Sequence, residues 1–421
     1  MASNYSFVHR RGVTLTTPLE GVTIIEVDNW MASPSAGAIL ADLGANLIKV
    51  EPLQGDPMRG MGRPAKLPSN MKEYDFQFDV SNRGKRSIAV DLDSDLGIQV
   101  VHDLVADADV FMCNLLAHRQ QRFKLDPATI TTLNSSIVHA TLTGYGTTGP
   151  EAWRPGYDVT AFFSRSGVFG GGTAPGGSPP HARPGSGDHT TSLALFGAVM
   201  AGLRSRDVTG EGQVVEASLL RTATWTISLD LVTSLVDGKP AYDRPREKGL
   251  SAMLEAFQAS DGRWLQFAMP DIGDAWQRFC IALDREDLLN QDEFSTGRLR
   301  YQNMNELLST LDESIGSKPV DHWIPRLDEH KCIWAPINDS ASAVQDPQVR
   351  ATGAFETIAH PVAGDFETVA APFRMHDSPE VRVKGPAPEK GQHTTEVLQD
   401  LLKLSDKEIA ELESDGVVRR G

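Results

Sequence analysis

Short apolar segments alternate with helical ones through the first third of the chain. Five of these segments are rich in Val, Ile and Leu, as buried strands are, and they span residues 22–27, 46–51, 87–92, 109–113 and 137–142. Helical stretches lie between them at 36–43, where Gly44 follows as a helix stop, and at 96–106. Strands that alternate with helices predict an α/β fold with a parallel, doubly wound sheet.

This alternation ends near residue 165. Gly and Pro crowd residues 165–187, which predicts a long loop without regular structure, and such loops often carry function. A helix is expected over 190–206, apolar on nearly every side and therefore buried. Residues 214–235 are expected to form another helix.

Length and pattern together predict two domains. The chain has 421 residues, more than one typical core accommodates. A hairpin is expected over 254–268 around the Asp261-Gly262 turn, and charged helical segments follow to about residue 330. We therefore expect a large domain over 1–235, a small α+β domain over 245–330, and a return to the large domain over 335–421.

Charge and cysteine content exclude several classes of protein. The chain carries 40 basic and 56 acidic residues, a net charge of −16, which disfavours a nucleic-acid partner. Its three widely spaced cysteines predict neither a disulfide framework nor a metal site, and they favour a cytoplasmic location. No apolar run approaches the roughly 18 residues that cross a membrane, and Met1 to Gly12 is too polar for a signal peptide.

The start of the chain resembles a dinucleotide-binding unit, because the second predicted strand ends at Glu51. A glycine-rich turn should then follow the first strand. Residues 28–35 contain no glycine, and Trp30 and Met31 stand where a backbone would have to approach a pyrophosphate. A site for NAD is therefore not expected, and no His, Cys and acidic residues show the spacing of metal ligands.

A basic run precedes the third predicted strand, where Arg83, Lys85 and Arg86 lie within four residues. Such a run is either a solvated loop or a place where phosphates bind. Asn114 and Arg122 follow the fourth strand, and loops at the carboxyl ends of parallel strands usually carry the ligand site.

Asp188 stands between a glycine-rich stretch and the long predicted helix. Asp is a preferred N-cap, so capping is the simplest interpretation. The alternative is a carboxylate nucleophile that attacks an activated acyl group, with backbone N–H groups near the developing oxyanion. The helix N-terminus would keep Asp188 ionised. Residues 155–158 and 144–146 are expected to be turns, with Asp158 as a helix cap.

Several motifs together resemble one family. They are, in order, residues 18–22, 41–52, 84–88, 144–146, 155–158, 187–188, 209–213, 335–337, 346–348 and 391–394. Their order and spacing resemble the class III CoA-transferase family, also called the CaiB/BaiF family, over about residues 18–402. The resemblance implies a Rossmann-like large domain built from both chain ends, a smaller domain between them, and two chains interlocked as a homodimer.

The resemblance also implies an activity. Asp188 matches the Asp that attacks an acyl-CoA donor, forms an anhydride and then an aspartyl-CoA thioester, and passes CoA to a carboxylic acid acceptor. CoA and its esters are substrates, and no cofactor is tightly bound. The positions matched to CoA contacts are Trp30, Met31, Lys85, Asn114, Arg122, Tyr145 and Tyr157, with Arg59 and Arg86 as further candidates.

The chain departs from the family pattern at three places. Pro52 stands where some members have a basic residue, and no glycine run lies between 235 and 270, which disfavours a formyl or oxalyl substrate. Tyr157 stands where the α-methylacyl-CoA racemases of this family have a His base, and a phenol is a poor base at neutral pH. A racemase, a non-catalytic CoA-binding protein and a nucleotide-binding regulator remain the alternatives to a transferase.

Overall fold

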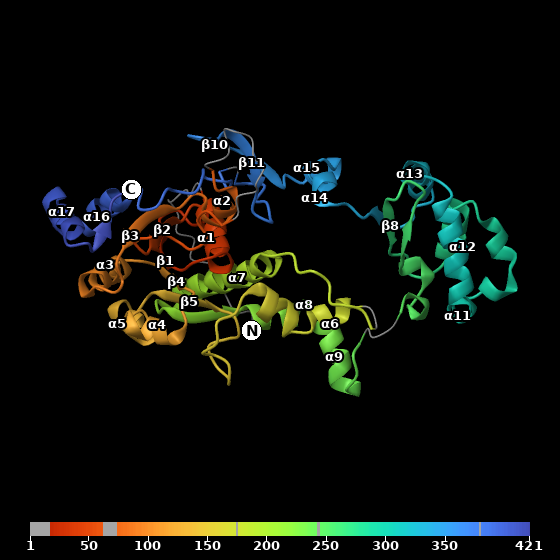
Figure 1. Ribbon diagram of the computed structural model, residues 1–421, viewed down its shortest axis with the longest axis horizontal. Helices are drawn as coiled ribbons and strands as arrows, with labels where there is room; N and C mark the ends of the chain where they lie inside the picture. Colours follow the sequence, from red (N-terminus) through yellow and green to blue (C-terminus); the bar gives the residue numbers. More distant parts are fainter. Residues whose placement is uncertain (1–16, 62–73, 174–175, 242–244, 379) are drawn as a thin grey trace, which may run out of the picture. The chain divides into compact units, whose positions relative to one another are not determined.

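The computed structural model describes residues 17–61, 74–173, 176–241, 245–378 and 380–421, so the segment Met1 to Gly12 lies outside the described residues. The chain divides into two compact units (Figure 1). The large unit comprises Met1–Gly170, Pro180–Asp237 and Gly353–Gly421, and the small unit comprises Gly171–Pro179 and Gly238–Thr352. The chain returns to the large unit later than the expected residue 335, because β9 (Trp334–Pro336) pairs with a strand of the small unit.

A seven-stranded sheet forms the centre of the large unit. Its strand order is β12-β3-β2-β1-β4-β5-β6, and all neighbours run parallel except β12, which is antiparallel to β3. The strands span β1 (Thr23–Val27), β2 (Asn46–Glu51), β3 (Arg86–Val90), β4 (Val110–Cys113), β5 (Val138–Thr143), β6 (Gln213–Ser218) and β12 (Val418–Arg419). The order 3-2-1-4-5-6 is that of the doubly wound dinucleotide-binding sheet, which confirms the Rossmann-like expectation.

Helices cover both faces of this sheet (Figure 1). Alternate side chains of β1 point to opposite faces: Ile25 and Val27 belong to one core cluster and Ile24 to the other. The first cluster includes side chains of α3 (Asp95–Ala106), α16 (Thr394–Leu402) and α17 (Asp406–Ser414), and the second includes α1 (Ala32–Asp42) and α7 (Ser186–Thr209). The large unit also contains α2 (Phe76–Asn82), α4 (Ala117–Arg122), α5 (Pro127–Leu133), α8 (Leu219–Thr226), α9 (Ser228–Asp237) and the antiparallel pair β10 (Phe355–His360) and β11 (Gly364–Val369).

α1 lies unusually close to the sheet. All eleven of its residues are buried, and a Cβ atom at Gly37 would lie 2.1 Å from the carboxylate of Glu26 on β1. The missing side chain at Gly37 therefore lets the helix approach a strand that carries a buried charge.

Two sequence-based expectations for the middle of the chain were wrong. α7 is buried along one stripe only, which includes Thr191, Leu195 and Val199, because the sheet covers a single side of a helix. Residues 214–235 do not form one helix, since β6 pairs with β5 before α8 and α9 begin. The 165–187 loop also contains the short helix α6 (Val168–Gly172).

The small unit contains a three-stranded antiparallel sheet and a group of helices. β7 (Ala256–Gln258) and β8 (Trp264–Phe267) form the expected hairpin, in which Gly262 adopts a φ of +82°. Its helices are α10 (Ala275–Ala282), α11 (Gly297–Gln302), α12 (Met304–Gly316), α13 (Val320–Glu329), α14 (Ser340–Ala343) and α15 (Pro347–Ala351). Phe257, Phe267, Phe279 and Trp323 lie in its core, so the unit has the expected α+β character.

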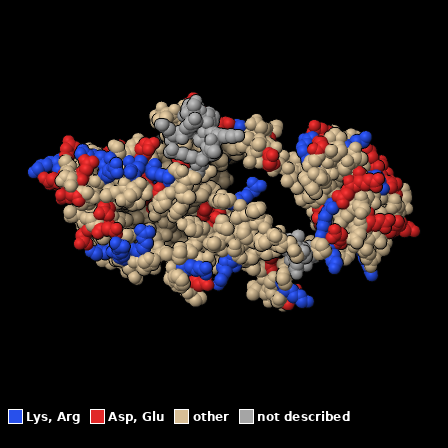
Figure 2. Space-filling model, in the orientation of Figure 1, with Lys and Arg blue, Asp and Glu red and all other residues tan. Residues whose placement is uncertain are grey.

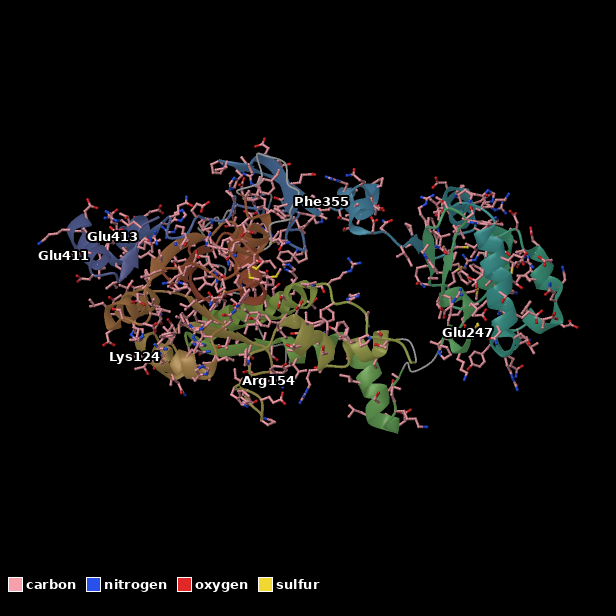
Figure 3. All side chains as sticks on the ribbon, viewed as in Figure 1. Lys124, Arg154, Glu247, Phe355, Glu411 and Glu413 are labelled. Atoms are coloured by element: carbon pink, nitrogen blue, oxygen red, sulfur yellow. The ribbon has the colours of Figure 1, made fainter. Side chains whose placement is uncertain are left out.

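Exposed charges have different distributions on the two units. On the face drawn in Figure 2, acidic side chains gather over the helices of the small unit, whereas acidic and basic side chains mix over the end of the large unit that carries α16 and α17. Several of the mixed charges form ion pairs. Glu411 and Glu413 on α17, labelled in Figure 3, pair with Lys407 and Arg420.

Candidate functional site

The loops after β1 and β4 meet at the point where the strand order of the sheet reverses. The backbone N–H of Asn29 donates to Asn114 Oδ1 over 3.1 Å, and Asn114 Nδ2 donates to the carbonyl of Asn29 over 2.7 Å. In open α/β sheets, ligands bind in the crevice beyond the carboxyl ends of the strands at such a reversal. Asn114 was predicted from the sequence, whereas Asn29 was missed, although it directly follows the first strand.

A cavity of about 210 Å³ opens at this reversal, entirely within the large unit. Four of the predicted site residues line it together: Trp30, Asn114, Tyr157 and Asp188. Its remaining walls are Asn29, Ala32, Leu115, Leu116, Arg119, Leu142, Thr143, Gly144, Pro155, Gly156 and Leu219.

Asp188 is the only aspartate or glutamate in the wall of this cavity among the described residues. It is the third residue of α7, and the N-cap is Gly185 with a φ of +88°, so Asp188 does not cap its helix. The capping interpretation is therefore wrong, and the side chain is free to face the cavity. A Cβ atom at position 187 would lie 2.8 Å from both Asp158 Cβ and Phe162 Cγ, so the preceding residue must be glycine.

The surroundings of Asp188 disfavour its charged form. Burial, and then the nearby carboxylate of Asp158, raise the pKa of Asp188 to about 7. The expected lowering of this pKa by the helix N-terminus is therefore not observed, because burial and the like charge shift the pKa upward.

Asp158 has a different role from the one its sequence predicted. It is the first residue of a π-helical segment (Asp158–Ser164), and its Oδ2 accepts the backbone N–H of Gly185 over 2.8 Å. Asp158 therefore holds the start of α7 instead of capping its own helix. Sequence reasoning missed this contact because the two residues lie 27 positions apart.

Two aromatic side chains form one wall of the cavity. The rings of Trp30 and Tyr157 meet edge to face with centroids 5.5 Å apart, and Tyr157 is 55 % exposed. Met31 is the N-cap of α1 and lies behind this wall, where a Cβ atom at Gly185 would meet its methyl group at 2.7 Å.

Tyr145 lies outside the cavity wall, against Gly156, and the guanidinium of Arg154 (labelled in Figure 3) is 5.7 Å from its ring centroid. Tyr145 therefore packs behind the cavity rather than lining it.

The three cations of the basic run have other partners. Arg83 pairs with the buried carboxylate of Asp42 over 2.9 Å. Lys85 is fully buried, and its Nζ donates to both carboxylate oxygens of Glu26 at 2.7 and 2.8 Å, to the carbonyl of Pro34 and to Asn82. Arg86 pairs with Glu396 and Asp400.

Arg59 donates twice to Glu51 and lies 4.0 Å from the ring centroid of Phe78. The basic run precedes β3, at the amino end of the sheet, and the cavity lies at the carboxyl ends. The structure thus gives Lys85, Arg86 and Arg59 structural contacts in place of the expected CoA contacts.

Two arginines do lie near the carboxyl ends of the strands. Arg122 is exposed and pairs with Asp93 over 2.7 Å. Arg119, which sequence reasoning missed, lines both the cavity of Asp188 and a neighbouring one of about 160 Å³ that extends past the ends of β1, β2 and β3. It forms no ion pair with another described residue, so its charge is available to a ligand. Its position one helical turn before Arg122 was the signal that could have identified it.

The described residues offer neither a membrane-spanning helix nor a metal site. No helix among them is both long and apolar enough to pass through a membrane. Within the same residues, no group of three or more His, Cys, Asp or Glu side chains is arranged to hold a metal ion.

Known proteins resemble the chain along most of its length. The family model for CoA-transferase family III matches residues 19–394. The succinyl-CoA:glutarate CoA-transferase of Homo sapiens is 32 % identical over 95 % of this chain and 90 % of its own length. The (R)-2-hydroxy-4-methylpentanoate CoA-transferase of Clostridioides difficile is 28 % identical over 95 % of this chain and 99 % of its own.

Solved structures have the same fold. A CaiB/BaiF family protein from Brucella suis has a TM-score of 0.80 at 27 % identity, over 91 % of this chain and 99 % of that chain. Rv3272 from Mycobacterium tuberculosis has a TM-score of 0.77 at 26 % identity, over 90 % of this chain and 98 % of that one. The chain belongs to CoA-transferase family III and is an enzyme of that class.

Proposed function

We propose that this enzyme moves CoA from an acyl-CoA donor to a carboxylic acid acceptor, with Asp188 as the covalent nucleophile. One observation carries the proposal: Asp188 faces a cavity of about 210 Å³ at the reversal point of the sheet, beside Trp30 and Asn114. A nucleophile at this edge of an open sheet lies where such folds bind their ligands.

The proposed reaction proceeds through four substitutions at carbonyl carbon. The Asp188 carboxylate attacks the thioester carbonyl of the donor, and the C–S bond breaks. CoA leaves as a thiolate, and a mixed anhydride of Asp188 and the donor acid remains. The thiolate attacks the aspartyl carbonyl, which releases the donor acid as its carboxylate and leaves an aspartyl-CoA thioester. The acceptor carboxylate attacks that thioester, its C–S bond breaks, and CoA thiolate is released as a second anhydride forms. CoA thiolate then attacks the acceptor carbonyl, which yields the new thioester and restores Asp188 without net proton uptake.

The electrostatics of the site suit this chemistry. A carboxylate whose pKa is raised to about 7 is more basic than a free aspartate, and it is still substantially ionised near neutral pH. A more basic carboxylate donates its electron pair more readily, as the general dependence of catalysis on pKa predicts. Burial, and then the neighbouring carboxylate of Asp158, thus raise the pKa and with it the reactivity of Asp188.

We assign CoA contacts to the residues that line or flank the two neighbouring cavities. Trp30 and Tyr157 offer flat apolar surface, Asn114 offers an amide, and Arg119 and Arg122 offer cations for phosphate groups. Met31 and Tyr145 support these walls from behind. The relatives named above act on glutarate and on a branched 2-hydroxy acid, so we infer an organic acid acceptor without narrowing it further.

We also propose that the enzyme is a cytoplasmic homodimer. Its cysteines, Cys113, Cys280 and Cys332, are unpaired, which fits a reducing compartment. Trp225, Leu229, Val232 and Val236 follow one another at helical spacing on α8 and α9 and are between 59 and 85 % exposed. An apolar stripe of this kind favours contact with another protein surface, and we assign it to a second copy of the chain.

The proposed activity is tested by incubating the purified enzyme with single acyl-CoA donors and mixtures of carboxylic acids. New CoA esters would be followed by mass spectrometry. Asp188→Asn should abolish transfer, whereas Asp207→Asn, an exposed aspartate on the same helix, should leave it unchanged. Transfer that persists in Asp188→Asn would contradict the mechanism. Deuterium uptake beside the thioester of a 2-methylacyl-CoA, without transfer, would favour a racemase instead.

A further inference from the structure

Trp30 has a backbone conformation that a bulky residue rarely adopts. Its φ is +68°, in the left-handed region where the Cβ atom crowds the following carbonyl. Four other described non-glycine residues have positive φ, and each of them follows the end of a helix: Lys124, Asp284, Lys331 and Lys403. Trp30 instead lies between β1 and α1. Such a conformation persists only when the surrounding structure imposes it.

Asp56 provides that constraint. The backbone N–H of Trp30 donates to Asp56 Oδ1 over 3.2 Å, and the same oxygen accepts the N–H of Met58 at 2.8 Å. The N–H of Asp56 itself donates to Glu51 Oε2 at 2.9 Å. Two backbone N–H groups thus bind the buried Asp56 carboxylate, and the Asp56 backbone N–H is itself bound. Asp56 therefore has little freedom to move, and it fixes the position of the Trp30 backbone.

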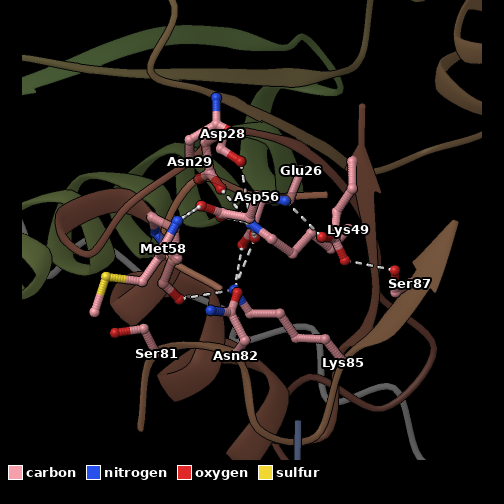
Figure 4. A network of polar contacts seen from close by, with 12 residues as sticks. Glu26, Asp28, Asn29, Lys49, Asp56, Met58, Ser81, Asn82, Lys85 and Ser87 are labelled. Atoms are coloured by element: carbon pink, nitrogen blue, oxygen red, sulfur yellow. Dashed lines mark hydrogen bonds and ion pairs between the residues drawn. The ribbon is translucent and has the colours of Figure 1, made fainter. Parts of the chain in front are cut away.

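A buried ammonium holds Asp56 in turn. Lys49 Nζ lies 3.0 Å from Asp56 Oδ2, and it donates to Glu26 and to Asp28 at 3.2 and 3.3 Å (Figure 4). All four side chains are 0 % exposed. A charge in such a place is stable only with partners, and removing one partner leaves the others uncompensated. The cluster is therefore a rigid support beneath the loop that carries Trp30.

We propose that Asp56, held by Lys49, is a positioning residue that fixes the Trp30 backbone and so sets the wall of the cavity that Asp188 faces. Neither Lys49 nor Asp56 lines that cavity, whereas Trp30 lines it and meets Tyr157 edge to face. The Lys49 ammonium pairs with the Asp56 carboxylate, and that carboxylate accepts the backbone N–H of Trp30, whose indole ring lines the cavity. The consequence for catalysis rests on the proposed function, since it takes this cavity to be the CoA ester site.

The effect of Asp56 on the position of Trp30 is tested with enzyme labelled with 5-fluorotryptophan. The chain has seven tryptophans, and the ¹⁹F resonance of Trp30 is identified by its loss in Trp30→Phe. Asp56→Ala should shift or broaden that resonance and raise the KM for the acyl-CoA roughly tenfold, the effect of about one lost hydrogen bond, with a smaller change in kcat. Asp56→Asn keeps an oxygen acceptor for the Trp30 N–H but loses the ion pair with Lys49, so it should shift the resonance and raise the KM less than Asp56→Ala does.

Asp126→Ala is the matched control. Asp126 also accepts a backbone N–H, from Thr129 at the start of α5, but it has no path to Trp30. It should leave both the Trp30 resonance and the KM unchanged. If Asp56→Ala does not fold, Asp56→Ser replaces it, because the shorter hydroxyl cannot span the bond but leaves a polar group beside Lys49.

The proposal is overturned if folded Asp56→Ala or Asp56→Ser retains the Trp30 resonance and the KM, or if Asp56→Asn perturbs both as strongly as alanine does. The ¹⁹F measurement needs no turnover. A failure of Asp188 as nucleophile and a failure of Asp56 as positioning residue would therefore be told apart.

Discussion

The backbone N–H of Gly185 donates to Asp158 Oδ2 over 2.8 Å, three residues before Asp188. This bond ties the start of α7 to the π-helical segment after Tyr157, and it brings a second carboxylate close to the nucleophile. The same residue that fixes the position of Asp188 therefore also raises its pKa.

Asp158→Asn separates these two effects. The amide oxygen can still accept the Gly185 N–H, but the negative charge that raises the pKa of Asp188 is lost. The pKa of Asp188 should fall, and the acidic limb of the kcat/KM profile should move to lower pH. Asp158→Ala, which also frees the loop, should lower activity at every pH. An unchanged acidic limb in Asp158→Asn would contradict the electrostatic role of Asp158.

Stability should depend on pH through Asp188. Its pKa rises from the ordinary 3.8 to about 7 in the folded enzyme, so the native state holds more protons than the unfolded chain between these values. The free energy of unfolding therefore falls as pH rises through this window, by roughly 2–4 kcal/mol from this group. Asp188→Asn should raise the Tm by several degrees at pH 8.5 and by less at pH 5, as measured by thermal unfolding. Asp207→Asn should show no such difference, and an equal Tm change at both pH values in Asp188→Asn would contradict the assignment.

Arg119 and Lys85 should respond in opposite ways to loss of charge. Arg119→Gln should raise the KM for acyl-CoA several-fold with little change in Tm, since Arg119 forms no ion pair with another described residue. Lys85→Met should destabilise the fold by about 3–5 kcal/mol, because it leaves the buried Glu26 with one cation fewer. Steady-state kinetics at two salt concentrations measure the KM of each variant, and thermal unfolding measures its Tm. A large KM effect from Lys85→Met with an unchanged Tm would reverse the assignment.

The apolar stripe on α8 and α9 should determine the oligomeric state. Leu229→Glu combined with Val236→Glu should convert the proposed dimer into a monomer of 45.8 kDa, as measured by light scattering after gel filtration. Val208→Glu, at another exposed apolar position, on α7, serves as control and should remain dimeric. If the double variant is dimeric, like the unmodified enzyme and Val208→Glu, the stripe is not the interface.

The sequence predicted the parallel sheet because strand character depends on local pattern. Local pattern alone favoured a helix cap at Asp188, and the family resemblance supplied its assignment as nucleophile. Apolar runs such as Asn46–Glu51 show their strand character directly. The glycine at position 187 marks the place where the chain before Asp188 packs closely against Asp158 and Phe162. β6 was missed because it follows a long helix and its first four residues alternate between partly buried and exposed, so no continuous apolar run marks it.

The site residues that were missed depend on contacts between distant parts of the chain. A basic run gives no sign of which end of a strand it occupies, so Lys85 was assigned to phosphate although it pairs with Glu26, 59 residues away. Asp158 and Asp56 act on the backbone of other loops, and no spacing in the sequence marks such pairs. Arg119 was overlooked for another reason, since only the three-dimensional structure shows which of several surface cations line the cavities.

The covalent role of Asp188 is tested most directly by trapping the intermediate. The enzyme would be incubated with an acyl-CoA donor and then with hydroxylamine or borohydride, and its intact mass and proteolytic peptides would be measured. The mechanism predicts a modification on the peptide that contains Asp188, absent when the donor is omitted and absent in Asp188→Asn. Full transfer activity without any adduct at Asp188 would contradict it.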